Sequence, residues 1–164
     1  MIDIWKRWYR KPYPWATRGR TPPVYLVLHH TAGPALQPVE VIRQYHERSR
    51  GWPHIGYHFV ATPKGVYKTL PLTVHPVCVR QYNPQSICVA ITGDWSNGVP
   101  REWTTLEARK VMEELAAIVA RIRRAYPGIR LVRHMDLVAT GCPGILTWDM
   151  VLNWKEEVSD AQES

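Results

Sequence analysis

The sequence predicts a three-layer α/β protein, in which a central mixed β-sheet is flanked by helices. Two observations lead to this class. Apolar, β-branched runs that are typical of buried strands recur along the chain, and segments with helical spacing of apolar residues alternate with them. The length of 164 residues suits one compact domain and leaves no room for a second one with its own core.

Five segments are expected to form the strands. They are 24–28, 55–62, 66–70, 86–92 and 129–133. The run from Val24 to Leu28 is continuously apolar, which is typical of a strand buried on both faces, and His29 follows its end. Pro63-Lys64-Gly65 separates the second and third segments as a hairpin turn would. His134 follows the last segment, so both histidines are expected at or just beyond the carboxyl ends of strands.

Three helices are expected around the sheet. The first begins at Pro38, places Val39, Ile42, Tyr45 and His46 on one side, and stops at Gly51. The second begins at the capping box Thr104-Thr105-Leu106-Glu107 and ends at Pro127-Gly128. Its apolar positions have helical spacing: Leu106, Val111, Leu115, Ile118, Val119 and Ile122. The third covers residues 148–157.

The chain divides into a basic, aromatic N-terminal arm (1–21), a main domain (22–158) and a C-terminal tail (159–164). Residues 1–20 carry six Lys or Arg against one Asp, so they contribute +5 of the net charge of +7. Prolines oppose regular structure there, which predicts an extended arm. Its tryptophans and tyrosines either cling to an anionic cell envelope or pack back onto the domain, and we expect partial packing with exposed cations.

Several classes of protein are excluded or disfavoured. The longest apolar runs fall far short of the roughly 20 residues that span a bilayer. The N-terminus lacks the apolar stretch of a secretory signal, so we expect synthesis in the cytoplasm. The basic charge suits a polyanion such as nucleic acid or the bacterial envelope, or is a solvated face that aids solubility, and no nucleic-acid-binding motif supports the first.

Two histidines and one cysteine carry the strongest chemical signal. His29 and His134 follow strands, and Cys142 comes eight residues after His134. Two imidazoles and a thiolate suit tetrahedral Zn²⁺ with one position left for water, and such an ion lowers the pKa of that water to roughly 7. The alternative is a packed histidine with a small buried cysteine, because a chain with seven histidines offers such pairs by chance.

Five blocks of sequence, in order, resemble one enzyme family. They are Val27 to Ala32, Gly51 to Phe59, Tyr82 to Ile87, Gly93 to Trp95, and His134 to Gly144. Together they resemble the zinc-dependent N-acetylmuramoyl-L-alanine amidases of the second amidase family, which includes amidase-type lysozymes of tailed phages and peptidoglycan recognition proteins. The resemblance covers about residues 22–155.

The resemblance implies roles for particular residues. One Zn²⁺ is expected on His29, His134 and Cys142, while His30 is a neighbour of the site. Tyr57 matches the catalytic tyrosine, whose phenol stabilises the developing oxyanion. Thr140 stands where the phage lysozymes commonly carry lysine; its hydroxyl can donate to an oxyanion but adds no charge, and we place it with Tyr57 as catalytic.

Substrate contacts follow less directly. His30, Trp52, Asn83 and Trp95 are candidates for binding glycan or stem peptide, although tryptophan is equally a packing residue. Asp136 can orient His134 or cap the following loop. Because side chains alternate along a strand, Tyr57 and His58 are expected on opposite faces.

The resemblance implies a peptidoglycan hydrolase that cuts the amide between N-acetylmuramic acid and L-alanine by zinc-activated water. The alternative is a non-catalytic peptidoglycan-binding module. The small chain without a signal resembles a phage endolysin, made in the host cytoplasm and acting on the cell wall after release. We expect a monomer that binds the glycan and stem peptide of peptidoglycan, and no nucleic acid.

Two thiols remain once Cys142 is assigned to metal. In the family, a histidine often stands where this chain has Cys78. Cys78 and Cys88 lie ten positions apart with Asn83-Pro84 between them as a turn, so they can form a disulfide. Two small buried thiols on neighbouring strands are the alternative.

Overall fold

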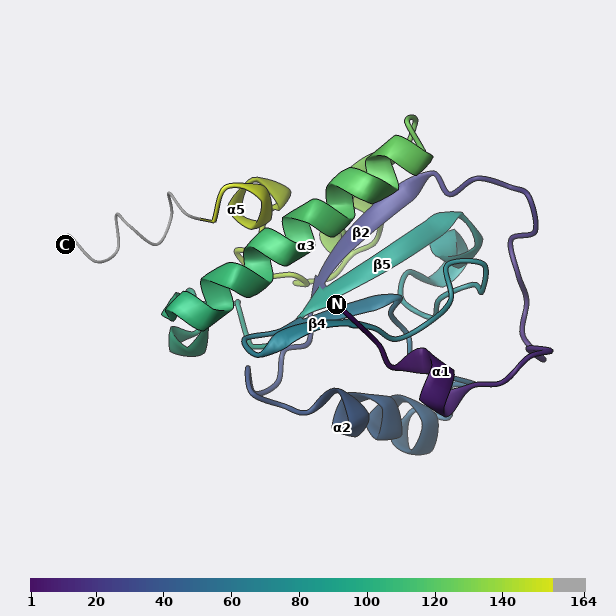
Figure 1. Ribbon diagram of the computed structural model, residues 1–164, viewed down its shortest axis with the longest axis horizontal. Helices are drawn as coiled ribbons and strands as arrows, with labels where there is room; N and C mark the ends of the chain where they lie inside the picture. The colour runs from purple at the N-terminus through teal and green to yellow at the C-terminus, as the bar shows by residue number, and fades with distance from the viewer. Residues whose placement is uncertain (155–164) are drawn as a thin grey trace.

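A central six-stranded sheet organises the structure, a computed structural model in which residues 1–154 are described (Figure 1). The strands are β1 (Ile2–Asp3), β2 (Tyr25–His30), β3 (Phe59–Thr62), β4 (Gly65–Lys68), β5 (Ser86–Ile91) and β6 (Arg130–Arg133). Their order is β1-β4-β3-β5-β2-β6. Only the β3–β4 hairpin is antiparallel within this described sheet, so the mixed sheet expected from the sequence is confirmed.

Helices cover the sheet on both sides. The helical segments are α1 (Trp5–Trp8), α2 (Val39–Gln44), the π-helix η1 (Tyr45–Ser49), the 3₁₀ helices η2 (Arg80–Gln85) and η3 (Arg101–Thr104), α3 (Leu106–Ala125), α4 (His134–Leu137) and α5 (Trp148–Leu152). The long helix α3 crosses one face and α2 lies on the other, which gives the three layers (Figure 1). Among the described residues, no helix is both long and apolar enough to cross a bilayer.

The buried strands divide their side chains between these two layers. Leu26 and Leu28 of β2 belong to the core that packs against α3. Because side chains alternate along a strand, Val27 and His29 point to the opposite face. The ligand candidate His29 is thus on the side of the sheet away from the large α3 core.

Several element boundaries differ from the sequence expectations. Regular pairing on β3 begins at Phe59 instead of residue 55, and the helix N-cap is Thr105, whose side chain accepts a hydrogen bond from the Ala108 amide. Leu106 is consequently 73% exposed and is not on the apolar face. Tyr45 is 52% exposed, because the helix changes to π geometry there and turns the side chain outward. Residues 155–157 of the expected last helix, and the tail 159–164, lie outside the described residues.

The N-terminal arm is packed, not extended. β1 adds a parallel strand beside β4, and Tyr9 is buried, donating to Glu47 and accepting from the Ile55 amide. Arg18 is buried as well, and its guanidinium donates to the carbonyls of Leu72, Pro84 and Ser86. The other five cations of the arm are exposed: Lys6, Arg7, Arg10, Lys11 and Arg20. Partial packing with exposed cations is therefore confirmed, with Arg18 as the exception.

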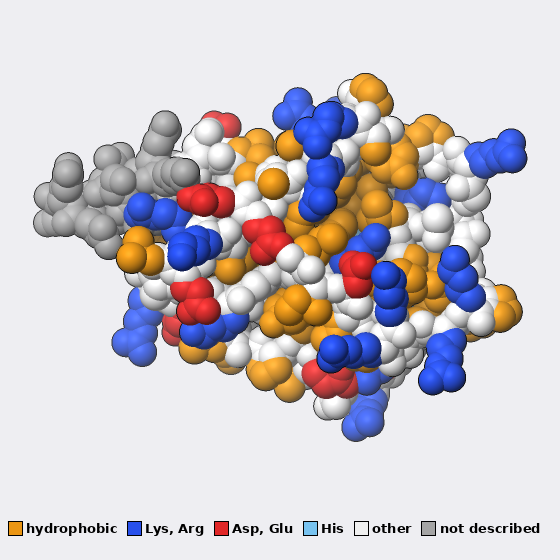
Figure 2. Space-filling view, viewed as in Figure 1, with side chains coloured by type: hydrophobic (Ala, Val, Ile, Leu, Met, Phe, Trp, Pro, Cys, Tyr) orange, Lys and Arg blue, Asp and Glu red, His pale blue; other side chains and the backbone are white. Residues whose placement is uncertain are grey.

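Positive charge is distributed rather than concentrated on the face that carries α3. Figure 2 shows Lys and Arg side chains at scattered positions, separated by acidic and apolar groups. This distribution is typical of a solvated surface.

His58 links strand β5 to the segment around Val74. Its Nδ1 accepts a hydrogen bond from the Cys88 amide at 3.0 Å, and its Nε2 lies 2.9 Å from the Val74 carbonyl oxygen. These partners require the neutral ring with the proton on Nε2. Burial lowers the pKa of His58 to about 3.

This histidine predicts acid sensitivity of the fold. Unfolded His58 has a pKa near 6.5, so the unfolded chain binds one more proton between about pH 6.5 and 3 and stability falls as the pH drops through that window. From pH 7 to 5 this group alone is expected to lower the free energy of unfolding by about 2 kcal/mol. Denaturant unfolding at both pH values measures it. The variant H58Q carries no titratable ring, so it should show a smaller loss over the same interval; an equal loss would contradict the prediction.

Candidate metal centre and its cleft

Three separate segments bring two imidazoles and one thiol together. His29 lies near the end of β2, His134 begins α4 immediately after β6, and Cys142 lies in the loop before Pro143. Their ligand atoms all lie within 4.8 Å of one another. The Cys142 Sγ is 3.7 Å from His29 Nδ1, and the two histidine rings are 4.5 Å apart.

The parallel sheet explains why the two histidines meet. β2 pairs with β6 in parallel, with Leu28 opposite Arg133. The residues that follow this pair, His29 and His134, are therefore neighbours at the carboxyl edge of the sheet. Cys142 is held there because the Met135 amide donates to its carbonyl oxygen and the His30 amide lies 3.4 Å from its sulfur.

Burial keeps this cluster uncharged. It lowers the pKa of His29 well below its usual value, and the neighbouring His134 lowers it further. Burial also lowers the pKa of His134 and raises that of the Cys142 thiol to about 11. His29 Nε2 and His134 Nδ1 are buried with no hydrogen-bond partner among the described residues. Neutral imidazoles with unused nitrogens beside a thiol are a donor set that fits Zn²⁺.

Tyr57 stands beside the cluster, as expected. Its ring centroid is 5.3 Å from that of His29 and 5.3 Å from that of His46. The Thr69 hydroxyl donates to its backbone carbonyl and fixes the segment. Burial raises the pKa of Tyr57, so the phenol keeps its proton and remains a hydrogen-bond donor. Its neighbour His58 points away into the core, which agrees with the expected opposite orientation.

An open cleft lies over the cluster. His29, His30, Trp52, Tyr57, Thr140 and Cys142 are among the residues that line it. Thr140 is exposed at the rim, and its hydroxyl oxygen lies 3.3 Å from the Cys142 amide. Trp52 is half-buried, and its ring lies tilted beside that of His46, with 4.4 Å between the ring centroids.

The other predicted contacts have different positions. His30 lines the cleft, but its Nδ1 accepts from the Trp95 amide. Trp95 is fully buried in the α3 core between Trp103 and Trp154, so we do not retain it as a substrate contact. Tryptophan is a packing residue as often as a binding one, and only burial distinguishes the two.

Two further residues have structural roles at the site. Asn83 lines an extension of the cleft, where its Oδ1 accepts from the amides of Cys78 and Val79 and holds that turn. Asp136 accepts from the Arg133 amide and pairs with its guanidinium, so it caps α4 rather than orienting His134.

Two arginines were missed by the sequence reasoning. Arg50 lines the cleft and lies over the Trp52 ring, 5.3 Å from its centroid. Arg80 lines the extension beside Asn83 and has φ of +46°, an unusual conformation for a non-glycine residue. Arg50 directly precedes the Gly51 to Phe59 block, and this position could have indicated a place at the site. Nothing in the sequence marks Arg80 as a site residue.

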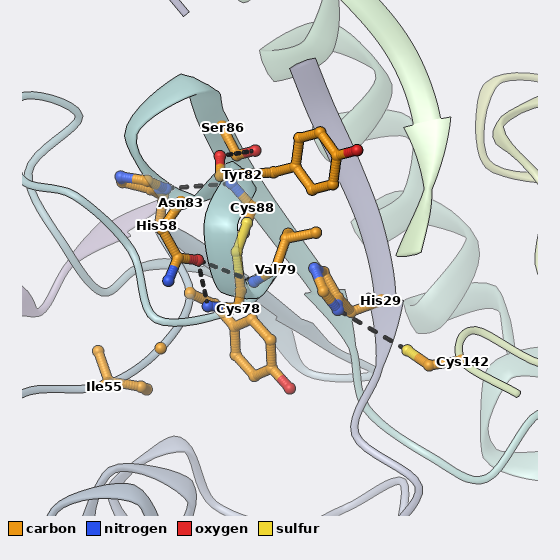
Figure 3. Close-up of a disulfide and its surroundings, with 12 residues drawn as sticks. His29, Ile55, His58, Cys78, Val79, Tyr82, Asn83, Ser86, Cys88 and Cys142 are labelled. Atoms are coloured by element: carbon orange, nitrogen blue, oxygen red, sulfur yellow. Dashed lines mark hydrogen bonds between the residues drawn. A yellow bond between two sulfur atoms is a disulfide. The ribbon is translucent and has the colours of Figure 1, made fainter. Parts of the chain in front are cut away.

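Cys78 and Cys88 form a disulfide, which confirms that pairing (Figure 3). Their Cα atoms are 6.7 Å apart. Cys88 lies on β5, and Cys78 is in the turn that Asn83 holds. Cys142 is a free cysteine, so its thiol is available as a ligand.

The family described as N-acetylmuramoyl-L-alanine amidase matches residues 19–145, so the chain belongs to that family. The family expected from the five sequence blocks is thereby confirmed.

Particular relatives include both a phage enzyme and animal proteins. The structure is similar to that of the Ph2119 endolysin from Thermus scotoductus MAT2119 bacteriophage Ph2119, with 48% identity, a TM-score of 0.84, and coverage of 92% of this chain and 95% of that one. Peptidoglycan-recognition protein SC1a of Drosophila melanogaster is 28% identical over 140 residues, which are 79% of this chain and 72% of the relative. The human N-acetylmuramoyl-L-alanine amidase is 30% identical over 163 residues, which cover 90% of this chain but 27% of that protein.

Proposed function

We propose that the chain is a zinc-dependent N-acetylmuramoyl-L-alanine amidase that hydrolyses the amide between N-acetylmuramic acid and L-alanine in peptidoglycan. The observation that carries this proposal is the convergence of His29, His134 and Cys142 at the base of an open cleft. Three protein ligands leave one tetrahedral position open, which distinguishes a catalytic zinc site from a structural one.

Different residues of the chain have different roles in the proposed hydrolysis. Bound zinc supplies a Lewis acid that activates water and polarises the amide carbonyl. His29, His134 and Cys142 would hold the ion. Tyr57, half-buried beside His29, donates a hydrogen bond from its phenol to the carbonyl oxygen as negative charge develops. The Thr140 hydroxyl, at the rim of the cleft, would donate a second hydrogen bond to this oxygen.

The substrate lies along the cleft and its extension. Trp52 offers an apolar face to the glycan or peptide, and His30 and Asn83 border the path. Arg50 and Arg80 add positive charge, which suits the acidic groups of a stem peptide. The exposed cations of the N-terminal arm add attraction to the anionic envelope.

A peptidoglycan-binding module without catalysis is the second candidate, because recognition proteins are among the relatives. The complete ligand set with Cys142 favours catalysis. Release of soluble fragments from purified cell walls, identified by mass spectrometry, distinguishes them: a hydrolase yields free L-alanine amino termini, whereas a binding module yields none. By analogy with the Ph2119 endolysin, we propose that the chain acts on the cell wall of a phage host after release from the cytoplasm.

One zinc per chain is expected in the purified protein. Elemental analysis measures it, and removal of the ion by a chelator should abolish lysis until zinc is restored. Replacing Cys142 by serine in C142S removes the only thiolate ligand and should lower zinc content well below one per chain. Full lytic activity in protein with far less than one zinc would contradict the assignment.

Tyr57 should contribute to turnover but not to metal binding. The variant Y57F is expected to keep its zinc and its unfolding midpoint while turnover on muropeptides falls by ~10²–10³, the range for one lost oxyanion donor. The matched control is Y25F, because Tyr25 lies at the far end of β2, where its ring packs on Tyr82. Turnover in Y57F within about twofold of the parent would show that the phenol is not catalytic.

A further inference from the structure

The Cys78–Cys88 disulfide lies directly against the ligand His29. In the pairing of β2 with β5, Cys88 is opposite Val27, two residues before His29. Paired residues on neighbouring strands share a face, and so do residues two apart on one strand, so Cys88 and His29 point the same way. A ring nitrogen of His29 and the two disulfide sulfurs all lie within 4.8 Å of one another.

His29 therefore stands between two groups of sulfur atoms. Figure 3 shows its ring between the disulfide on one side and Cys142 on the other. His29 Nδ1 is directed toward Cys142, while Nε2 is buried without a hydrogen-bond partner among the described residues. Two thiolates and an imidazole at this separation are a donor set that zinc prefers, but only when both cysteines are reduced.

We propose that, in the reduced chain, His29, Cys78 and Cys88 form a second zinc site, which the disulfide abolishes. The inference rests on the proposed function in one respect, namely that the hydrolytic site also uses His29. Because the two sites share this ligand, the reduced thiols compete with His134 and Cys142 for one ion. Thiolates then occupy the positions that water and substrate need, so the reduced chain is a poor amidase.

Oxidation converts one site into the other. Cys78 lines the cleft and is half-buried, whereas Cys88 is fully buried, so exchange begins at Cys78. The Cys78 thiolate attacks a low-molecular-weight disulfide and releases one small thiol. The Cys88 thiolate then attacks the Cys78 sulfur and releases the second. Two cysteine thiols lose two electrons and two protons, and the small disulfide gains both as two thiols.

The variant C142S isolates the second site. Cobalt(II) serves as the probe, because its thiolate charge-transfer absorption reports sulfur ligands directly. Oxidised C142S should bind little cobalt and show no such band. After reduction with a phosphine and removal of the reductant without air, C142S should gain a band about twice as intense per cobalt as that of oxidised wild-type protein, since two thiolates replace one.

Controls separate the possible failures. Thiol counting in denaturant must give two thiols for reduced C142S and none for the oxidised form. The double variant C142S/C88S lacks one thiolate, so its reduced form should lose most of the band. Two free thiols in folded, reduced C142S without a cobalt–thiolate band would overturn the second site. Absence of metal from oxidised wild-type protein would instead contradict the hydrolytic site.

Wild-type protein provides a second measurement that does not depend on variants. Reduction should increase the band per cobalt and lower muropeptide hydrolysis at least several-fold, and a small disulfide should reverse both. Hydrolysis and absorption that remain unchanged after the thiol count rises from one to three would contradict the inference.

Discussion

The parallel pairing of β2 with both β5 and β6 is the constraint on which the site depends. Parallel strands run in the same direction, so the residues at their carboxyl ends lie at the same edge of the sheet. Here that rule brings His29 beside His134, although 105 positions separate them in the sequence. The same pairing in register with β5 brings Cys88 to His29. The central strands therefore position the imidazoles, the disulfide and the floor of the cleft together.

Burial determines the chemistry of these groups. His29 is buried on the face of the sheet opposite α3, and Cys142 is half-buried in the loop that precedes Pro143. Neutral imidazoles and a protonated thiol are the stable forms in such surroundings. A divalent cation changes that balance, because it compensates the thiolate charge and uses the nitrogens that hydrogen bonds leave free. The same desolvation preserves the proton of Tyr57 for donation.

The sequence predicted the sheet, the long helix and the convergence of His29, His134 and Cys142, because each leaves a signature in the sequence. Apolar runs indicate buried strands, and five ordered blocks indicate the family. Trp95 could not be placed in the same way, since an indole that packs and an indole that binds have the same pattern. Helical spacing predicts Tyr45 on the inner face, but the side chain is exposed, because a π-turn changes the helical period without a marker in the sequence. The sequence indicates an exposed charge at Arg18, because the three carbonyl groups that bind its buried guanidinium are distant in the chain.

Because Cys142 lies in a loop, an ion bound to it would also act as a cross-link in the fold. Cys142 belongs to no helix or strand, and it is 113 positions from His29 in the chain. An ion held by both residues closes a very long loop, and the entropy lost by the unfolded chain grows with the logarithm of that length. The ion then acts as a reversible cross-link between the first central strand and the last third of the chain. Resistance to heat and to proteases in this protein should therefore follow the concentration of free zinc, by mass action, as much as it follows the packing of the core.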